Sequence, residues 1–249
     1  MSMPSRFVTG SPLRHVIIMT LTNSAGIMAL FVVDLIDLLF LNMLGEQELA
    51  ASIGFSAQIL FFLTSISIGI LVSIGVLVSQ RIGAGETDKA KRMAMSIYLF
   101  SVIVSIISSA LVFYYLADIL QLLKAKGRTF ELAMTYTQII LPSTVILTLS
   151  MVFSGALRAL GDAKRSMYAT LIGAVVNLIL DPILIFGLDM GIAGAATASV
   201  AARFAMMFYA AHGALKIHGL ILISTVKAHF EDFLKILKFA IPAMLTNLS

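Results

Sequence analysis

The stretch Asn177-Leu-Ile-Leu-Asp181-Pro182 places an amide, a carboxylate and a proline inside the apolar run 171–188. An aspartate at the centre of a bilayer costs about 2.5–3.5 kcal/mol on insertion scales, so such residues usually face a cavity and serve a function. Asn177 and Asp181 are four residues apart and share one face of a helix. Pro182 cannot donate to the carbonyl one turn earlier, which leaves that oxygen available to a cation or a water. The stretch therefore predicts a small cation or proton site within a membrane bundle. The alternative is a polar pair that only joins two helices.

The composition indicates an integral membrane protein. Of the 249 residues, 59% are hydrophobic and 12% are charged, whereas a soluble domain has about 25% charged residues. The absence of cysteine excludes disulfides and thiolate metal sites within this sequence. The net charge of +4 comes from basic residues in short loops between apolar runs, so we expect no nucleic-acid partner. The first apolar run is too long for a signal-peptide core and is predicted to be a retained first span.

Six apolar runs are long enough to cross a bilayer, which takes about 20 helical residues. They are residues 16–43, 50–80, 93–117, 132–157, 166–188 and 191–214. Continuous apolarity of this length favours helices over barrel strands. Of the 17 basic residues, 13 lie before span 1, in the 2–3 and 4–5 connectors or after span 6. By the positive-inside rule we expect both termini to be cytoplasmic.

Span 1 contains two carboxylates, Asp34 and Asp37, which share a helix face because they are three residues apart. Two carboxylates so close together would not both ionise in a low dielectric, so one is expected to hold a proton or a metal ion in its place. The alternative is that one of them reaches the interface from the end of the helix. We favour Asp37 over Asp34 as the functional residue.

Span 6 begins Gly191-Ile-Ala-Gly194-Ala-Ala, a run of small residues that allows close approach to a neighbouring helix. Thr197 and Ser199 follow; both offer a hydroxyl to an ion, although small polar residues in packed spans usually serve packing. Arg203, well inside the span, requires a carboxylate partner or a water-filled vestibule, and its role stays open. In the connectors 79–92 and 158–165, glycines and capping residues favour turns over binding loops.

The last segment, residues 224–249, differs from the six-helix unit 1–223. Apolar residues from Phe230 to Leu237 recur with helical spacing, which predicts an amphipathic helix at the cytoplasmic interface. A new apolar run opens at Phe239 but is too short to span. Its Leu245-Thr246-Asn247 repeats Leu21-Thr22-Asn23 of span 1, 224 positions earlier. We interpret it as the start of a second six-helix repeat, so the chain is expected to form the first lobe of a protein near twice its length.

Several of these segments together resemble the multidrug and toxic compound extrusion (MATE) transporters, in the family's order and spacing from about Leu13 onward. The motifs are Asp37-Leu-Leu-Phe-Leu-Asn-Met-Leu-Gly45, Glu48-Leu-Ala-Ala-Ser-Ile-Gly54, Val78-Ser-Gln-Arg-Ile-Gly83-Ala-Gly85, Ala156-Leu-Arg158-Ala-Leu-Gly161-Asp162, Asn177-(x3)-Asp181-Pro182 and Gly191-Ile-Ala-Gly194-Ala-Ala. The resemblance implies two six-helix lobes around a central cleft, which exchange a small-molecule substrate for Na+ or H+. An all-α, six-helix transmembrane lobe of such a two-lobe transporter, plus the start of a seventh helix, is the predicted fold.

The resemblance also implies a coupling-cation site, which by motif falls on Asp37, Asn177, Asp181 and Ser199, with Na+ possible at the first three. Family members carry a threonine where this chain has Ser199, and Asp34 is an extra carboxylate beyond the common pattern. No proline occurs between Pro12 and Pro142, so span 1 lacks the kink-forming proline that some members use.

The predicted function is cation-coupled efflux of amphipathic, often cationic drugs across the bacterial cytoplasmic (inner) membrane. No enzymatic activity and no cofactor besides the coupling ion are expected, and a second six-helix lobe is the expected partner. One alternative is a flippase for lipid-linked precursors, which would need a cleft lined by basic residues; Arg203 is the one candidate. A second is a non-transporting fragment. An intramembrane protease is disfavoured because the sequence has neither Gly-x-Gly-Asp nor His-Glu-x-x-His.

Overall fold

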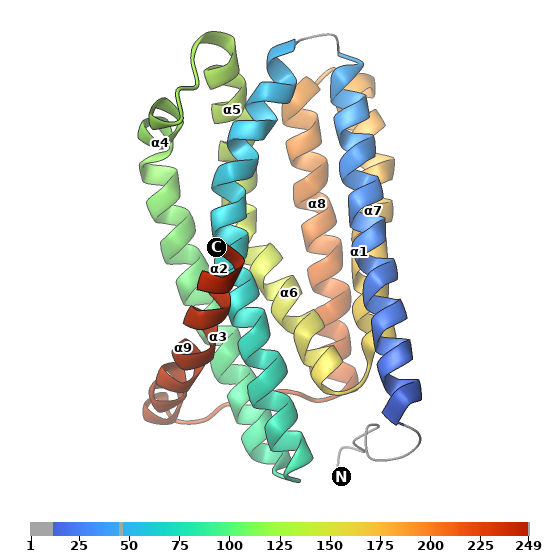
Figure 1. Ribbon diagram of the computed structural model, residues 1–249, viewed down its shortest axis with the longest axis vertical. Coiled ribbons are helices and arrows are strands. Elements are labelled where there is room, and N and C mark those ends of the chain that lie inside the picture. Colours follow the sequence, from blue (N-terminus) through green and yellow to red (C-terminus); the bar gives the residue numbers. More distant parts are fainter. Residues whose placement is uncertain (1–11, 45–46, 249) are drawn as a thin grey trace.

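The computed structural model describes residues 12–44 and 47–248, and within these ranges the chain is helical with no strand (Figure 1). The elements, in chain order, are α1 (Pro12–Asn42), α2 (Gln47–Gly83), α3 (Thr87–Tyr114), α4 (Leu116–Leu122), α5 (Gly127–Ile140), a 3₁₀ turn (Leu141–Ser143), α6 (Thr144–Ala159), α7 (Ala163–Pro182), a π-helical turn (Ile183–Gly187), α8 (Gly191–Ala211), a second π-helical turn (His212–Ile217) and α9 (Val226–Leu248).

Six segments of this described part are long and apolar enough to cross a membrane, which confirms the six predicted spans. They are Met19–Leu41, Glu48–Gly83, Thr87–Tyr114, Gly127–Ala159, Ala163–Gly187 and Gly191–Ile217. The start of α1, the α2–α3 and α6–α7 connectors and the start of α9 lie at one end of the bundle, the lower end in Figure 1. The predicted basic connectors thus share one end of the bundle. The compartment that this end faces stays a prediction.

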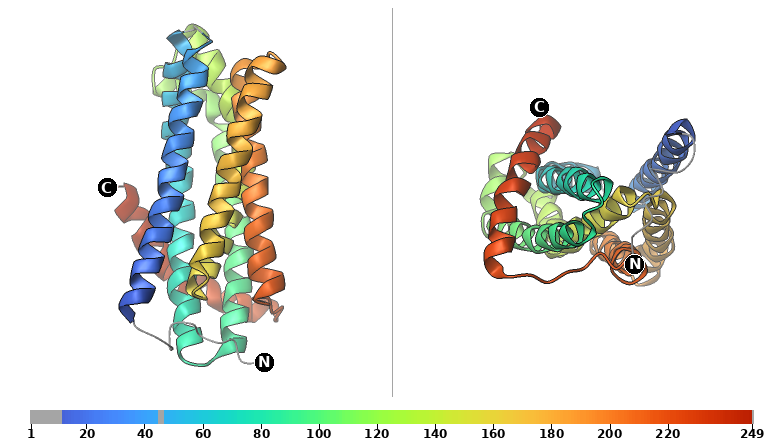
Figure 2. Two further views of the ribbon diagram at one scale, coloured as in Figure 1. Left: turned by 90° about the vertical axis from the view of Figure 1, so that its right-hand side faces the viewer. Right: turned by 90° about the horizontal axis from the view of Figure 1, so that it is seen from below.

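The core of the lobe lies between α2, α3 and α6. Its fully buried side chains include Ile74, Ile97 and Leu157. Buried serines and threonines join α2 to α6 and to α5. The hydroxyl oxygens of Ser67 in α2 and Thr148 in α6 are 2.8 Å apart, and the hydroxyl of Thr137 in α5 donates to that of Ser56 in α2 over 2.9 Å. Each of these four hydroxyls meets a partner, as burial in an apolar bundle favours. On the other side of the lobe, α1 packs mainly against α7, which packs against α8 (Figure 2).

Span 4 is interrupted at mid-length, which the sequence reasoning did not anticipate. Pro142 cannot donate a backbone hydrogen bond, and the chain makes a 3₁₀ turn there before α6 begins. The carbonyl of Leu141 in this turn accepts hydrogen bonds from Ser109 (2.8 Å) and Thr144 (2.6 Å). These side chains satisfy the backbone where the helix is broken, so the interruption is tolerated within the membrane.

The predicted amphipathic segment and the short apolar run after it form one continuous helix, α9, which lies across α2 and α3 on the side away from α1 (Figure 2). Near its start, the buried carboxylate of Asp232 pairs with Arg92 of α3 at 3.2 Å and accepts a hydrogen bond from Ser96 over 3.1 Å. Near its end, Asn247 donates to Ser65 of α2 over 2.8 Å. Polar contacts near both of its ends therefore bind α9 to α2 and α3.

Candidate cation site

The two carboxylates predicted to be functional, Asp37 and Asp181, meet between α1 and α7. They are close enough for one carboxyl group, when protonated, to donate a hydrogen bond to the other. Asp181 is fully buried and Asn177, one turn earlier in α7, is 5% exposed. The structure thus brings together the acidic residues of span 1 and span 5, which are 144 positions apart in the sequence.

The polar atoms of this cluster lack partners within the described part of the chain. These atoms are Oδ1 of Asp37, both carboxylate oxygens of Asp181 and Nδ2 of Asn177, all buried without a hydrogen bond. Buried polar groups are nearly always paired, and two ionised carboxylates in a low dielectric repel each other strongly. The cluster therefore needs a proton or a cation between its oxygens, and carboxylate and amide oxygens suit either H+ or Na+.

Apolar side chains close the outer end of the cluster. Phe40, one turn after Asp37, packs edge-to-face on Phe186 with the ring centroids 6.0 Å apart. Buried residues of α1, α2, α5 and α8 form a cluster beyond it: Leu41, Leu49, Leu132, Ile192 and Ala195, together with Ile185 of the π-helical turn. This packing excludes water from that side and lowers the local dielectric around the carboxylates.

The other candidate residues lie on α8 and α1. Ser199 lies half-buried on α8, which packs on α7, and its hydroxyl has no recorded hydrogen bond to any described residue. The hydroxyl of Thr197 donates to the carbonyl of Ala193 over 2.7 Å, and the lone pairs of its oxygen are not used by this bond. Asp34 lies in α1, but its side chain falls outside the described part of the structure. The roles of Ser199 and Asp34 stay predictions.

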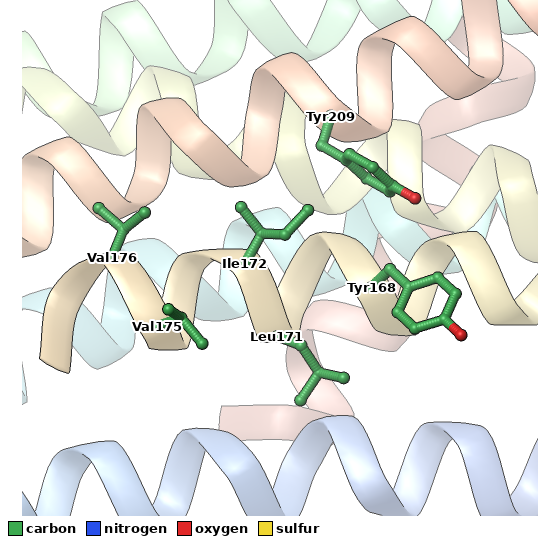
Figure 3. Close-up of a pocket in the computed structure, with 6 residues that line it drawn as sticks. All are labelled: Tyr168, Leu171, Ile172, Val175, Val176 and Tyr209. Atoms are coloured by element: carbon green, nitrogen blue, oxygen red, sulfur yellow. The ribbon is translucent and has the colours of Figure 1, made fainter. Parts of the chain in front are cut away.

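A surface pocket of about 480 Å³ opens beside α7, but it is separate from the acidic cluster (Figure 3). Its walls are the apolar or aromatic side chains of Tyr168, Leu171, Ile172, Val175 and Val176 of α7 and Tyr209 of α8. It holds no charged group and does not contribute to a cation site.

The sequence of the lobe matches the model of the MatE family over residues 24–183. The chain belongs to the MatE family. The "FAD transporter" of Shewanella oneidensis is 31% identical over 195 residues, which cover 76% of this chain and 43% of that protein. The "Multidrug export protein MepA" of Staphylococcus aureus is 23% identical over 225 residues, 90% of this chain and 50% of that protein. The chain therefore spans about half the length of the curated relatives it matches.

Solved structures of MatE proteins share the fold. One, described as the outward-facing conformation of a multidrug resistance MATE family transporter, is 25% identical, with a TM-score of 0.88; the match covers 96% of this chain and 53% of that chain. A Pyrococcus furiosus transporter, whose description reports a binding pocket of reversed polarity, superposes with a TM-score of 0.90 at 24% identity; that match covers 98% of this chain and 54% of that one. The MatE match and these structures confirm the predicted six-helix transporter fold, and each solved chain is about twice as long as the part that this chain matches.

A second polar cluster, at the connector end of the bundle, holds spans 4, 5 and 6 together. Asp162 caps α7 by accepting from the backbone N–H of Arg165, and its carboxylate also binds the Arg165 guanidinium at 2.8 Å and His218 Nε2 at 2.9 Å. The turn before it uses Gly161 at φ +81°, which confirms the predicted helix end and fresh start. Burial acts to raise the pKa of Asp162, but the hydrogen bonds from His218 and Arg165 outweigh it and hold that pKa below its ordinary value.

Because the pKa of Asp162 is lower in the folded protein, its contribution to stability is present above the ordinary carboxyl pKa and is lost as the pH falls below about 4. We expect Asp162→Asn to lower the free energy of unfolding of the detergent-solubilised protein at pH 7 by about 1 kcal/mol or more. The loss is measured as a lower thermal unfolding midpoint. The gap between wild type and variant should narrow as the pH is lowered through 4. Asp118→Asn, at an exposed position in α4, is the control. A gap that is the same at pH 7 and pH 3.5 would contradict the assignment.

Proposed function

We propose that this lobe carries the ion-coupling site of a transporter that exchanges Na+ or H+ for an amphipathic organic compound across the bacterial cytoplasmic membrane. The observation that supports it best is the pair Asp37 and Asp181, whose buried oxygens lack partners between two helices. Family membership supports transport rather than catalysis. A second six-helix lobe completes the substrate cleft in this proposal, and both termini are cytoplasmic.

The pair gives a direct physical route to coupling. With both carboxyls ionised, their repulsion drives α1 and α7 apart; a proton or Na+ between them removes the repulsion and favours the closed packing of these helices. The ion can shift this equilibrium only by its difference in affinity for the two packings. The substrate favours the packing that the ion does not, so ion entry drives substrate exit.

Two substrate classes remain, each supported by a relative. The multidrug exporter of Staphylococcus aureus favours amphipathic, often cationic drugs. The second candidate is an anionic compound such as a flavin nucleotide, favoured by the name of the Shewanella relative and by the positive charge of Arg203 inside the bundle.

The test uses proteoliposomes that contain the protein with both lobes. Substrate flux is measured with an imposed Na+ gradient, an imposed pH gradient, each gradient reversed, or no gradient. We expect one of the two gradients to drive uptake against the substrate gradient and its reversal to reverse the flux. Flux that is indifferent to both gradients would overturn the proposed coupling.

A further inference from the structure

Arg203 is a charged side chain near the middle of α8 with no carboxylate partner among the described residues. The structure gives its guanidinium two hydrogen bonds, both from Nη1: one to the carbonyl of Ile140 (3.3 Å) and one to the hydroxyl of Ser143 (2.7 Å). Both acceptors are neutral, and both belong to the broken part of span 4. Tyr136 of α5 lies near enough to interact with it electrostatically. Within the described ranges, no carboxylate balances this positive charge.

A structural role alone does not account for a charge at this position. The interruption at Pro142 leaves backbone and hydroxyl acceptors that need a donor, but a neutral amide such as glutamine supplies donors without the cost of burying a charge. An arginine at the centre of a membrane helix is among the most costly residues on insertion scales. Such residues usually face the interior of a bundle and act on a substrate or an ion.

The guanidinium of Arg203 also has donors that are free to bind a further group. Ser143 and Ile140 occupy only Nη1, and Nε and Nη2 have no hydrogen bond to any described residue. Although Arg203 lies deep in the lobe, the residue keeps some accessible surface. On the same face of α8, one turn earlier, Ser199 is also only half-buried. The hydrogen bonds of Nη1 fix the orientation of the planar group, and so also the positions of Nε and Nη2. Such a planar pair of donors matches two oxygens of a phosphate or carboxylate.

We propose that Arg203 binds the phosphate or other anionic group of the transported compound, and so selects anionic amphipathic substrates. This rests on the second candidate of the proposed function. The Ser143 and Ile140 contacts fix the guanidinium in place before the substrate arrives, so little side-chain entropy is lost on binding. Binding of an anion supplies the missing counter-charge, and a cationic drug at the same place is repelled.

The experiment compares two ligands that differ only by a phosphate, flavin mononucleotide and riboflavin, binding to the purified protein with both lobes in lipid nanodiscs. Binding is read from the anisotropy of the flavin fluorescence. We expect the wild type to bind flavin mononucleotide at least tenfold more tightly than riboflavin, since hydrogen bonds to charged groups contribute about 1.5–3 kcal/mol. No ion gradient is applied, so the result does not depend on the proposed coupling.

In Arg203→Gln we expect the phosphate preference to disappear while riboflavin binds as before. Arg203→Lys keeps the charge without the planar pair of donors and should restore part of the preference. Arg128→Gln, an equal loss of charge on an exposed arginine of α5, should change neither affinity. Equal weakening of both ligands in Arg203→Gln would show a brace for span 4 only, and equal affinity of the wild type for both ligands, or for neither, would likewise overturn the proposal.

Discussion

Replacing Asp181 with asparagine is expected to lower ion-driven transport at least fivefold while leaving the helix bundle at least as stable as the wild type. The two effects separate because Asp181 is buried beside a second carboxylate and its oxygens have no hydrogen-bond partner among the described residues. Asparagine removes the like-charge repulsion, and its amide can donate to Asp37. A structural role would predict the opposite, because removing one member of a stabilising buried pair is strongly destabilising.

The measurement pairs gradient-driven flux with thermal unfolding on the same preparations. A coupling free energy of about 1–3 kcal/mol corresponds to a 5- to 150-fold change, so we expect gradient stimulation to fall by that factor in Asp181→Asn and in Asp37→Asn. The double variant should be no worse than either single one, since the two carboxyls act as one site. Asp88→Asn, exposed in the first turn of α3, is the control. Full stimulation in both single variants would remove these residues from the site.

The spans and the acidic pair were within reach of the sequence because the membrane constrains them so strongly. A bilayer requires about 20 apolar helical residues per crossing, and a carboxylate within such a run is rare enough to mark a site. The resemblance to the MATE family then implied that Asp37 and Asp181 share one cation site, before their contact was seen. The helices that pack around these two residues could not be predicted. The small residues of α8 indicate a close approach to a neighbouring helix but do not show which helix it is.

Features that depend on the packing of several helices were missed. Pro142 was visible in the sequence, but the 3₁₀ turn that it causes was not. The side chains that form hydrogen bonds with this turn belong to α3, α6 and α8. The same holds for Asp232, whose place in an amphipathic pattern predicts solvent exposure, whereas the structure buries it against Arg92. A polar residue on a helix is exposed or buried according to which partner it meets, and that partner lies far away in the sequence.

Replacing Gly194 with alanine is expected to weaken ion coupling at the acidic site although the carboxylates themselves are unchanged. Gly194, in the first turn of α8, lies directly against the π-helical turn that follows Pro182. A Cβ there would lie 2.7–2.9 Å from backbone atoms of Leu184 and Ile185. Backbone cannot rotate out of the way as a side chain does, so α8 must move away from the end of α7. We expect a loss of about 1–3 kcal/mol of stability, the usual cost of overpacking.

The displacement also reaches function, because Leu184 follows Asp181 by three residues and Ile185 belongs to the apolar packing beyond the site. We expect weaker ion coupling in Gly194→Ala with the carboxylates intact, measured as the ion concentration that gives half-maximal flux. Gly54→Ala in α2 is the matched control: its Cβ meets nothing within 4 Å, and alanine is favoured over glycine in a helix by about 0.8–1.0 kcal/mol. The close approach of α8 to α7 holds the site only if Gly194→Ala is the less stable of the two variants and also needs more ion for half-maximal flux.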